Sequence, residues 1–372
     1  MRIDIPMKGI ELVDWKQLSA EMKGALNRAI EREDFVLGED VSAFESEAAA
    51  YLGVKHAIGL NSGTDAFRIA LVAIGLQAGD EVITTPFCFA SDAAAVVIEG
   101  GTPVFADIDP LTTNIDINRI EEKITPKTRA ILPAHMYGVP VDMDPLMELS
   151  REHNIYIIED ACQAFGATYK GKKAGSFGEF AGYSFYPTKP LGSYGDSGLI
   201  STDSEEFAEK VNMIRNHGSR KKYYHEHIGF SSRLDTIQAA VLRVRLKHVD
   251  SILGSLSKIH DLYDHGLRGL EEITLPPQMP DITRGFTHYT IRLAKRDELR
   301  DHLARNGINA GVYFPLSIHL QPAFAFLGYK PGDFPESEKT QEEVLSLPFD
   351  IHTTEEQVDE VCRAIRKFFI GQ

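Results

Sequence analysis

The chain has 372 residues, enough for two packed domains, and its 43% hydrophobic and 25% charged residues are ordinary for a globular protein. A formal net charge of −15 repels phosphate backbones, which excludes general nucleic-acid binding. The basic run Arg215–Lys222 could still form a local phosphate contact, or it could be a solvated loop.

Cysteine usage and the N-terminal sequence indicate the cellular compartment. The three cysteines include no CxxC pair, so neither a disulfide framework nor a zinc site is supported. The N-terminus has no signal-peptide pattern, and the chain contains no run of about 18 apolar residues. We therefore expect a cytoplasmic protein without membrane contact.

The first predicted elements are helical, over residues 20–52, with an interruption at Phe35–Gly38. From residue 55 short apolar runs alternate with amphipathic stretches such as Ala66–Ile74 and Asp144–Glu152. The runs are His56–Leu60, Glu81–Thr85, Pro103–Ala106, Ala130–Pro133, Ile155–Ile158, Gly182–Phe185 and Gly198–Ser201. This alternation predicts an α/β fold with a mainly parallel seven-stranded sheet. Such sheets bind ligands beyond the carboxyl ends of their strands.

The pattern changes after about residue 235. A long helical stretch, Gln238–Leu270, is followed by a Pro-rich linker at Leu275–Pro277. The elements expected beyond it are a strand at Thr287–Leu293, a helix at Asp297–Asn306, a strand near Ala310–Tyr313 and a terminal helix at Thr354–Phe369. We therefore divide the chain into a large domain, residues 1–250, and a smaller C-terminal α+β domain, residues 251–372.

Two segments that follow predicted strands suit a planar, phosphorylated ligand. The segment NSGTDA opens a helix, where Gly63 and Thr64 could seat a phosphate on free N–H groups. The alternative is an ordinary N-cap by Ser62 or Thr64. In TPFCFA, Phe89 could lie flat on a ring, or it could be a core side chain.

Two further segments carry acids and an amine. Glu159 and Asp160 end a buried strand, where a carboxylate needs a positive partner such as a protonated pyridine nitrogen, unless it caps the next loop. Gln163 follows three residues later and could bond a ring oxygen. Lys189 lies in a polar loop and would ordinarily be solvated. Held in a pocket with these groups, it could lose its proton and act as nucleophile and acid/base.

These residues resemble the DegT/DnrJ/EryC1/StrS sugar aminotransferases, a branch of the fold-type-I pyridoxal-phosphate (PLP) enzymes. The resemblance runs nearly end to end, through NSGTDA, TTPFCFASDAAA, PVFADIDP, IEDACQAFGATYKGKKAGSFG, YSFYPTKPLGSYGDSG and GFSSRLDTIQAA. It implies that Lys189 is the Schiff-base lysine and Asp160 the partner of the pyridine nitrogen. It further implies that Phe89 stacks on the cofactor ring and that Gln163 lies near its phenolic oxygen. The phosphate ligands that it implies are Gly63, Thr64 and Ser184.

The resemblance also implies a homodimer with active sites between the subunits. The segment around Ser231 and Arg233 would contribute to the active site of the other subunit. Ser231 stands where the family usually has an asparagine that reaches the cofactor phosphate, so this contact is lost, bridged by water or replaced. Phe314 likewise stands where the family has a tyrosine. The candidate substrate contacts are Arg233, Tyr186, Tyr313 and His319, although His319 could instead be a packing histidine.

The implied reaction moves an amino group, expected from L-glutamate, onto a C3 or C4 keto group of a nucleotide-linked sugar, with pyridoxamine phosphate as the intermediate form of the cofactor. One alternative is a PLP-dependent dehydratase or deaminase, although dehydratases of the family have histidine in place of Lys189. Another is a cofactor-binding regulator without turnover, which has no need of a proton-shuttling lysine. A dehydrogenase is disfavoured because no GxGxxG lies at a strand-to-helix turn. The nucleotide and the sugar stay open.

Overall fold

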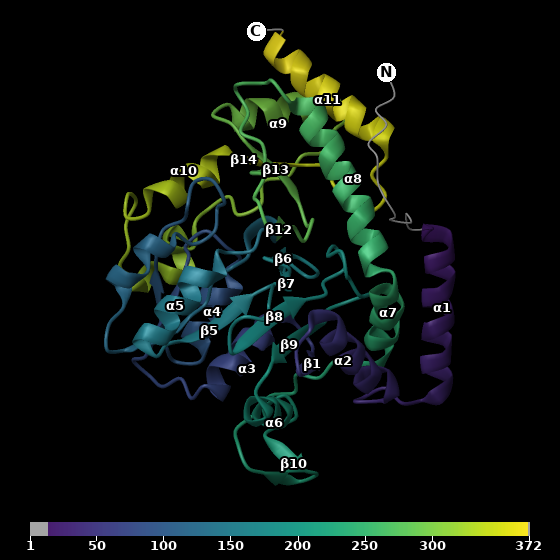
Figure 1. Ribbon diagram of the computed structural model, residues 1–372, viewed down its shortest axis with the longest axis vertical. Helices are drawn as coiled ribbons and strands as arrows, with labels where there is room; N and C mark the ends of the chain where they lie inside the picture. The colour runs from purple at the N-terminus through teal and green to yellow at the C-terminus, as the bar shows by residue number, and fades with distance from the viewer. Residues whose placement is uncertain (1–13, 371–372) are drawn as a thin grey trace.

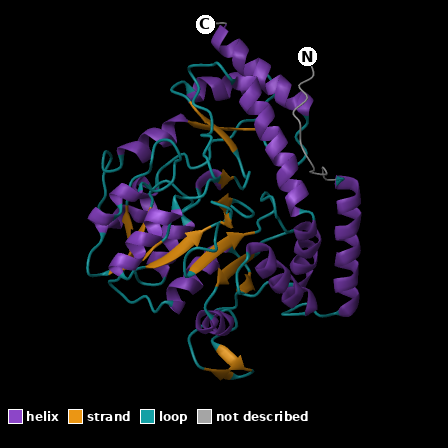
Figure 2. Ribbon diagram, viewed as in Figure 1, coloured by secondary structure: helices purple, strands orange, loops and turns teal. Residues whose placement is uncertain are grey.

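The computed structural model describes residues 14–370 and has a seven-stranded sheet at its centre, with helices on both sides (Figures 1 and 2). The strands lie in the order β1-β9-β8-β5-β4-β2-β3. Their bounds are β1 His56–Leu60, β2 Glu81–Thr84, β3 Thr102–Phe105, β4 Thr128–Ile131, β5 Tyr156–Asp160, β8 Phe180–Ser184 and β9 Gly198–Thr202. Only β9 runs against its neighbours β1 and β8. The predicted mainly parallel sheet is confirmed.

Helices bury their apolar sides on both faces of this sheet. Successive strand residues point to opposite faces, so Ile158 enters the core under α3, α4 and α6, and Ile157 enters the core under α5. Helices α2 and α7 extend the second face against Leu199. The helix bounds are α2 Glu39–Leu52, α3 Gly63–Ala73, α4 Ser91–Ile98, α5 Met143–His153, α6 Glu205–Ile214 and α7 Thr236–Lys247.

The C-terminal part forms a separate core, drawn above the sheet in Figure 1. There the antiparallel pair of β13 and β14 is covered by helices. The bounds are α8 Val249–Leu267, β13 Tyr289–Arg292, α9 Arg296–Arg305, α10 Pro335–Glu343, β14 Val344–Leu347 and α11 Glu355–Ile370. Helix α8 serves both parts, because Leu253 packs in the core of α2 and α7 whereas Tyr263 packs in the C-terminal core. The division of the chain near residue 250 remains a prediction.

The sequence interpretation was wrong at two places in the C-terminal part. The long helix expected over Gln238–Leu270 is two helices, because His248 leaves helical geometry with φ −108° and ψ 6°. The strand expected near Ala310–Tyr313 does not form. Gly311 makes only an isolated bridge to Ser346, and Phe314 has a left-handed φ of 64°. The partner of β13 is β14, a four-residue strand that was not predicted.

The remaining elements lie at the periphery. Helix α1, Trp15–Arg32, stands beside α7 (Figure 1). One small sheet contains β6 Thr168–Tyr169, β7 Lys172–Lys173 and β12 Ile282–Thr283. Another contains β10 Ser219–Lys221 and β11 Tyr224–His225. The basic run divides: Arg215 is buried in an ion pair with Glu45, while Lys221 and Lys222 are exposed on the β10–β11 hairpin. No helix among residues 14–370 is both long and apolar enough to cross a membrane.

Candidate active site

The sheet brings several of the expected residues to one edge. Asp160 ends β5 and Ser184 ends the parallel neighbour β8. Helix α3 begins at Gly63, after β1, which runs in the same direction as β8 because both are antiparallel to β9. The carboxyl ends of codirectional strands meet at the same edge of a sheet, so these residues share one site.

The start of α3 offers N–H groups to a ligand. Ser62 caps the helix by accepting a hydrogen bond from the N–H of Asp65 at 3.2 Å, so the N-cap alternative is correct for Ser62. The helix itself supplies no acceptor for the N–H groups of Gly63 and Thr64. A Cβ atom at Gly63 would lie 2.7 Å from Sγ of Cys162. It would also lie 3.1 Å from Cβ of Ser184 on β8, so glycine lets the helix start lie close to the ends of β5 and β8, and the first turn can accept an anion.

Lys189 lies in the loop after β8, where its N–H donates to the carbonyl of Tyr186 at 2.8 Å. Its side chain is partly buried near Cys162 and Asp160. Burial lowers the pKa of the Lys189 amine, and the neighbouring Cys162 and Asp160 oppose that shift only in part. This amine loses its proton more readily than a surface lysine, which suits covalent and proton-transfer chemistry.

Asp160 is buried, and one of its oxygens accepts a hydrogen bond from the N–H of Cys162 at 2.9 Å. A second carboxyl, Asp92 in the first turn of α4, lies near it and was missed from the sequence. Asp92 is fully buried, and burial raises its pKa well above the usual value, with a further contribution from the charge of Asp160. Burial therefore favours the protonated form of Asp92. A lone acid in the apolar run ASDAAAVV was the available signal.

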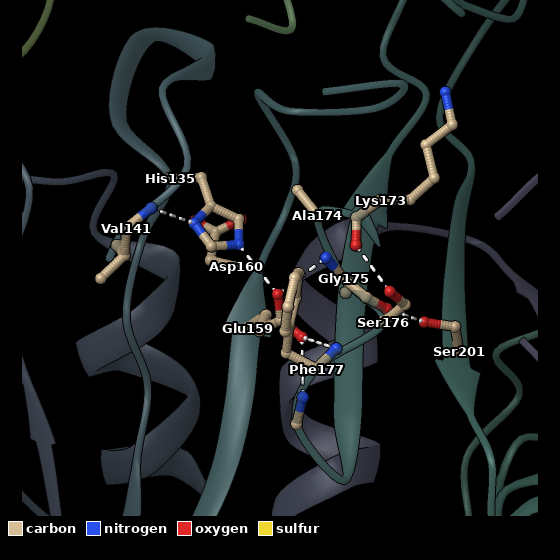
Figure 3. Close-up of polar contacts among 12 residues, drawn as sticks. His135, Val141, Glu159, Asp160, Lys173, Ala174, Gly175, Ser176, Phe177 and Ser201 are labelled. Carbon is tan, nitrogen blue, oxygen red and sulfur yellow. Dashed lines mark hydrogen bonds and ion pairs between the residues drawn. The ribbon is translucent and has the colours of Figure 1, made fainter. Parts of the chain in front are cut away.

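Glu159, the other acid of the pair, forms a buried network next to Asp160 (Figure 3). One of its oxygens accepts a hydrogen bond from Nε2 of His135 at 3.0 Å. Nδ1 of His135 accepts from the N–H of Val141 at 3.0 Å, so Nε2 carries the proton. Backbone N–H groups donate three more hydrogen bonds of 2.7–2.8 Å to Glu159, from Gly175, Phe177 and Gly178. Four donors thus take the place of the positive partner expected for a buried acid, and Glu159 is structural.

Gln163 and Phe89 offer groups to a ring. The Gln163 side chain is buried, and its carbonyl oxygen accepts a hydrogen bond from the N–H of Tyr137 at 3.2 Å. That bond orients the amide, whose Nε2 lies 3.9 Å from the sulfur of Met136. The Phe89 ring is 60% exposed, so the alternative of a core phenylalanine is wrong. It can cover a ligand instead.

Ser231 and Arg233 lie together beside the loop after α6. Ser231 is exposed, and its hydroxyl accepts a hydrogen bond from Arg233 at 3.0 Å. The same guanidinium donates to the side chain of Asn216 at 2.9 Å. The structure therefore places the two residues together, and neither lines the cavity that contains Lys189.

A cavity of about 510 Å³ opens beside Lys189, between its loop and the C-terminal core. Tyr313 lines it together with His288, which was not singled out in the sequence. The centroids of these two rings are 4.2 Å apart. Burial, together with the charge of Lys189, lowers the pKa of His288 to about 3, so this imidazole is neutral. Tyr186, from the same loop as Lys189, is half-exposed.

His319 does not line this cavity. Its ring is buried against Phe334, and Nε2 lies 3.1 Å from a carboxylate oxygen of Glu338. These contacts favour the packing alternative over a contact with the sugar.

A helix start that can accept an anion, a partly buried amine and a buried carboxylate at one edge of an α/β sheet define the class of PLP-dependent transferases. The chain belongs to the DegT/DnrJ/EryC1/StrS aminotransferase family, whose model matches residues 16–366. It is 44% identical over 372 residues to a pleiotropic regulatory protein of Geobacillus stearothermophilus, covering 99% of each chain. It is 42% identical over 354 residues to the dTDP-3-amino-3,4,6-trideoxy-α-D-glucose transaminase of Streptomyces venezuelae, covering 95% of this chain and 93% of the relative.

Solved structures agree with this membership. The structure of S. venezuelae DesV in complex with a ketimine intermediate superposes with a TM-score of 0.93 at 42% identity, covering 96% of this chain and 98% of that one. The structure of NtdA from Bacillus subtilis with bound pyridoxamine phosphate gives a TM-score of 0.87 at 30% identity, covering 98% and 86%. The predicted fold class is therefore confirmed.

Proposed function

We propose that this protein is a PLP-dependent aminotransferase that moves an amino group from an amino acid, L-glutamate in our assignment, onto the C3 or C4 keto group of a nucleotide-linked sugar. The observation that carries the proposal is the partly buried amine of Lys189 near the buried carboxyl of Asp160. The related transaminase of S. venezuelae, named for a dTDP-linked 3-amino sugar, supports the substrate class.

The residues present fit the cofactor. Gly63, Thr64 and Ser184 would hold its phosphate at the start of α3, where a Cβ at position 63 would fill the close approach to Cys162. Asp160 would face the pyridine nitrogen, with Phe89 on the ring and Gln163 near the phenolic oxygen. When bound, PLP supplies an electron sink for the carbon that loses a proton.

Lys189 would perform the proton transfers. Burial lowers its pKa, so this amine loses its proton more readily than a surface lysine and could take a proton from the α-carbon of the donor. In the second half of the reaction the same amine would move protons in the opposite direction. His288 is too weak a base to replace it, because its pKa is about 3.

We further propose a homodimer. Ser231 and Arg233 are exposed or partly exposed outside the cavity that contains Lys189, which suits a role in the site of a second copy. The exposed Phe89 ring would gain cover at such an interface. The three unpaired cysteines suit the cytoplasmic location that we assign.

The regulatory name of the G. stearothermophilus relative keeps a cofactor-binding regulator as the second candidate. Adding glutamate to the cofactor-loaded protein separates the two candidates, because only an aminotransferase loses the absorbance of the lysine-bound cofactor and releases a keto acid.

Lys189→Ala tests the residue assignment. We expect the variant to retain cofactor through the phosphate contacts and to lose the absorbance of the lysine-bound form, with turnover falling at least about 1,000-fold. Lys172→Ala, an exposed lysine on β7, is the matched control and should turn over normally. Near-normal turnover by Lys189→Ala would refute the assignment.

A further inference from the structure

Arg245, near the C-terminal end of α7, is a buried cation next to the catalytic loop. Only 6% of its surface is exposed. Its guanidinium donates one hydrogen bond, of 2.9 Å, to the carbonyl of Pro190, the residue after Lys189. Arg245 also lines the cavity of about 510 Å³ that contains Lys189, His288 and Tyr313. The guanidinium therefore lies beside the loop that carries Lys189.

This guanidinium lacks an acidic partner. Nε is buried without a hydrogen bond, and no carboxylate among residues 14–370 forms an ion pair with Arg245. The acid that lines the same cavity, Asp350, is exposed and accepts hydrogen bonds from its own turn, from the N–H of His352 and the hydroxyl of Thr353. Burial lowers the pKa of Arg245, and the phenol of Tyr194 opposes the shift in part. A buried cation without a counter-charge is costly, so an anionic ligand would relieve it.

The shape and polarity of the cavity indicate which anion fits. None of the three proposed phosphate ligands, Gly63, Thr64 and Ser184, lines it, so the cofactor phosphate has a separate seat. A guanidinium matches the planar carboxylate in a two-pronged geometry, which lysine does not offer. The neutral His288 in the same cavity adds no negative charge that would repel a carboxylate.

We propose that Arg245 is the carboxylate-binding residue for the amino donor, and that it holds a donor carboxylate in the cavity beside Lys189. The inference rests on the proposed aminotransferase function and adds to it a residue that selects dicarboxylic or other carboxylate-bearing donors. A carboxylate could also arrive on the sugar, as in a uronic acid. The two half-reactions distinguish these sources, because the donor takes part only in the first and the sugar only in the second.

The experiment follows each half-reaction separately by absorbance in the dimeric holoenzyme. For Arg245→Met we expect the glutamate concentration that gives half-maximal rate in the first half-reaction to rise about tenfold to hundredfold, the value of one charge-assisted hydrogen-bonded contact. The second half-reaction, from the pyridoxamine-phosphate form with the keto sugar, should change less than about twofold. Arg245→Lys keeps the positive charge but not the two-pronged geometry of the guanidinium, so its effect on the first half-reaction should be intermediate. Lys247→Met, an exposed cation on the same helix, is the control and should resemble wild type.

Three results with Arg245→Met overturn the inference. Equal losses in both half-reactions mean that Arg245 only anchors the Lys189 loop through Pro190. A loss confined to the second half-reaction assigns the carboxylate to the sugar, and no loss in either removes the subsite. If Arg245→Met fails to fold, Arg245→Lys is assayed instead for inhibition of the first half-reaction by glutarate, a dicarboxylate without an amine. Inhibition weakened at least about threefold supports the subsite, and unchanged inhibition overturns it. A wild-type protein without a donor half-reaction contradicts the proposed function instead.

Discussion

Replacing Glu159 with glutamine should destabilise the protein although the two side chains have nearly the same shape. The carboxylate is fully buried and accepts four hydrogen bonds, two on each oxygen. A glutamine oxygen can keep the N–H groups of Phe177 and Gly178, but its NH₂ group then faces the donors on His135 and Gly175. His135 cannot adapt by moving its proton, because Nδ1 already accepts from the N–H of Val141.

The magnitude follows from the two donors left without an acceptor. Each buried unsatisfied donor costs about 1–3 kcal/mol, so Glu159→Gln should lower the free energy of unfolding by about 2–6 kcal/mol. This is a large share of the roughly 5–15 kcal/mol typical of a folded domain. Urea unfolding followed by circular dichroism gives the difference, with Glu148→Gln on the exposed side of α5 as the control.

The control should stay within about 0.5 kcal/mol of wild type. A Glu159→Gln variant that unfolds within the same margin would show that the network contributes little. A lower stability with unchanged cofactor absorbance would confirm that Glu159 supports the fold and leaves ring chemistry to Asp160.

Two further predictions concern the site residues. Asp92 has a folded-state pKa above its unfolded value of about 3.8, so the folded state binds the extra proton and stability falls as pH rises above that value. Asp92→Asn cannot ionise, so urea unfolding should show it gaining stability relative to wild type as pH rises from about 4 to about 8. A pH-independent difference would contradict the raised pKa of Asp92. At Gly63, an added Cβ would meet Sγ of Cys162 at 2.7 Å, so Gly63→Ala should cost about 1–3 kcal/mol of unfolding free energy and weaken cofactor retention in dialysis. The double variant Gly63→Ala/Cys162→Ala should recover most of that stability, and no recovery would refute the steric explanation.

The sheet and the edge that binds ligands could be predicted because its strands are short apolar runs and most of them alternate with helical stretches. The sequence could not separate the tasks of Glu159 and Asp160, since neighbouring residues of a strand face opposite sides and either could have met the expected positive partner. Asp92 and Arg245 were missed for another reason. Each comes to the site from a helix distant in sequence from Lys189, and only the packing of α4 and α7 shows that they lie there. β14 escaped prediction because it follows α10 directly, with no Gly or Pro between Glu343 and Val344 to mark the boundary.

Helix α8 joins the two cores of the molecule as a continuous rod, with Leu253 in one and Tyr263 in the other. The cavity beside Lys189 lies between the same two parts and includes Leu256, from the middle of that rod. The C-terminal layer therefore cannot swing away from the sheet as a free lid without bending α8 or carrying it along. We expect the cavity to open by movement of the loops at residues 309–316 and 348–352. A bulky nucleotide sugar would then enter past these loops.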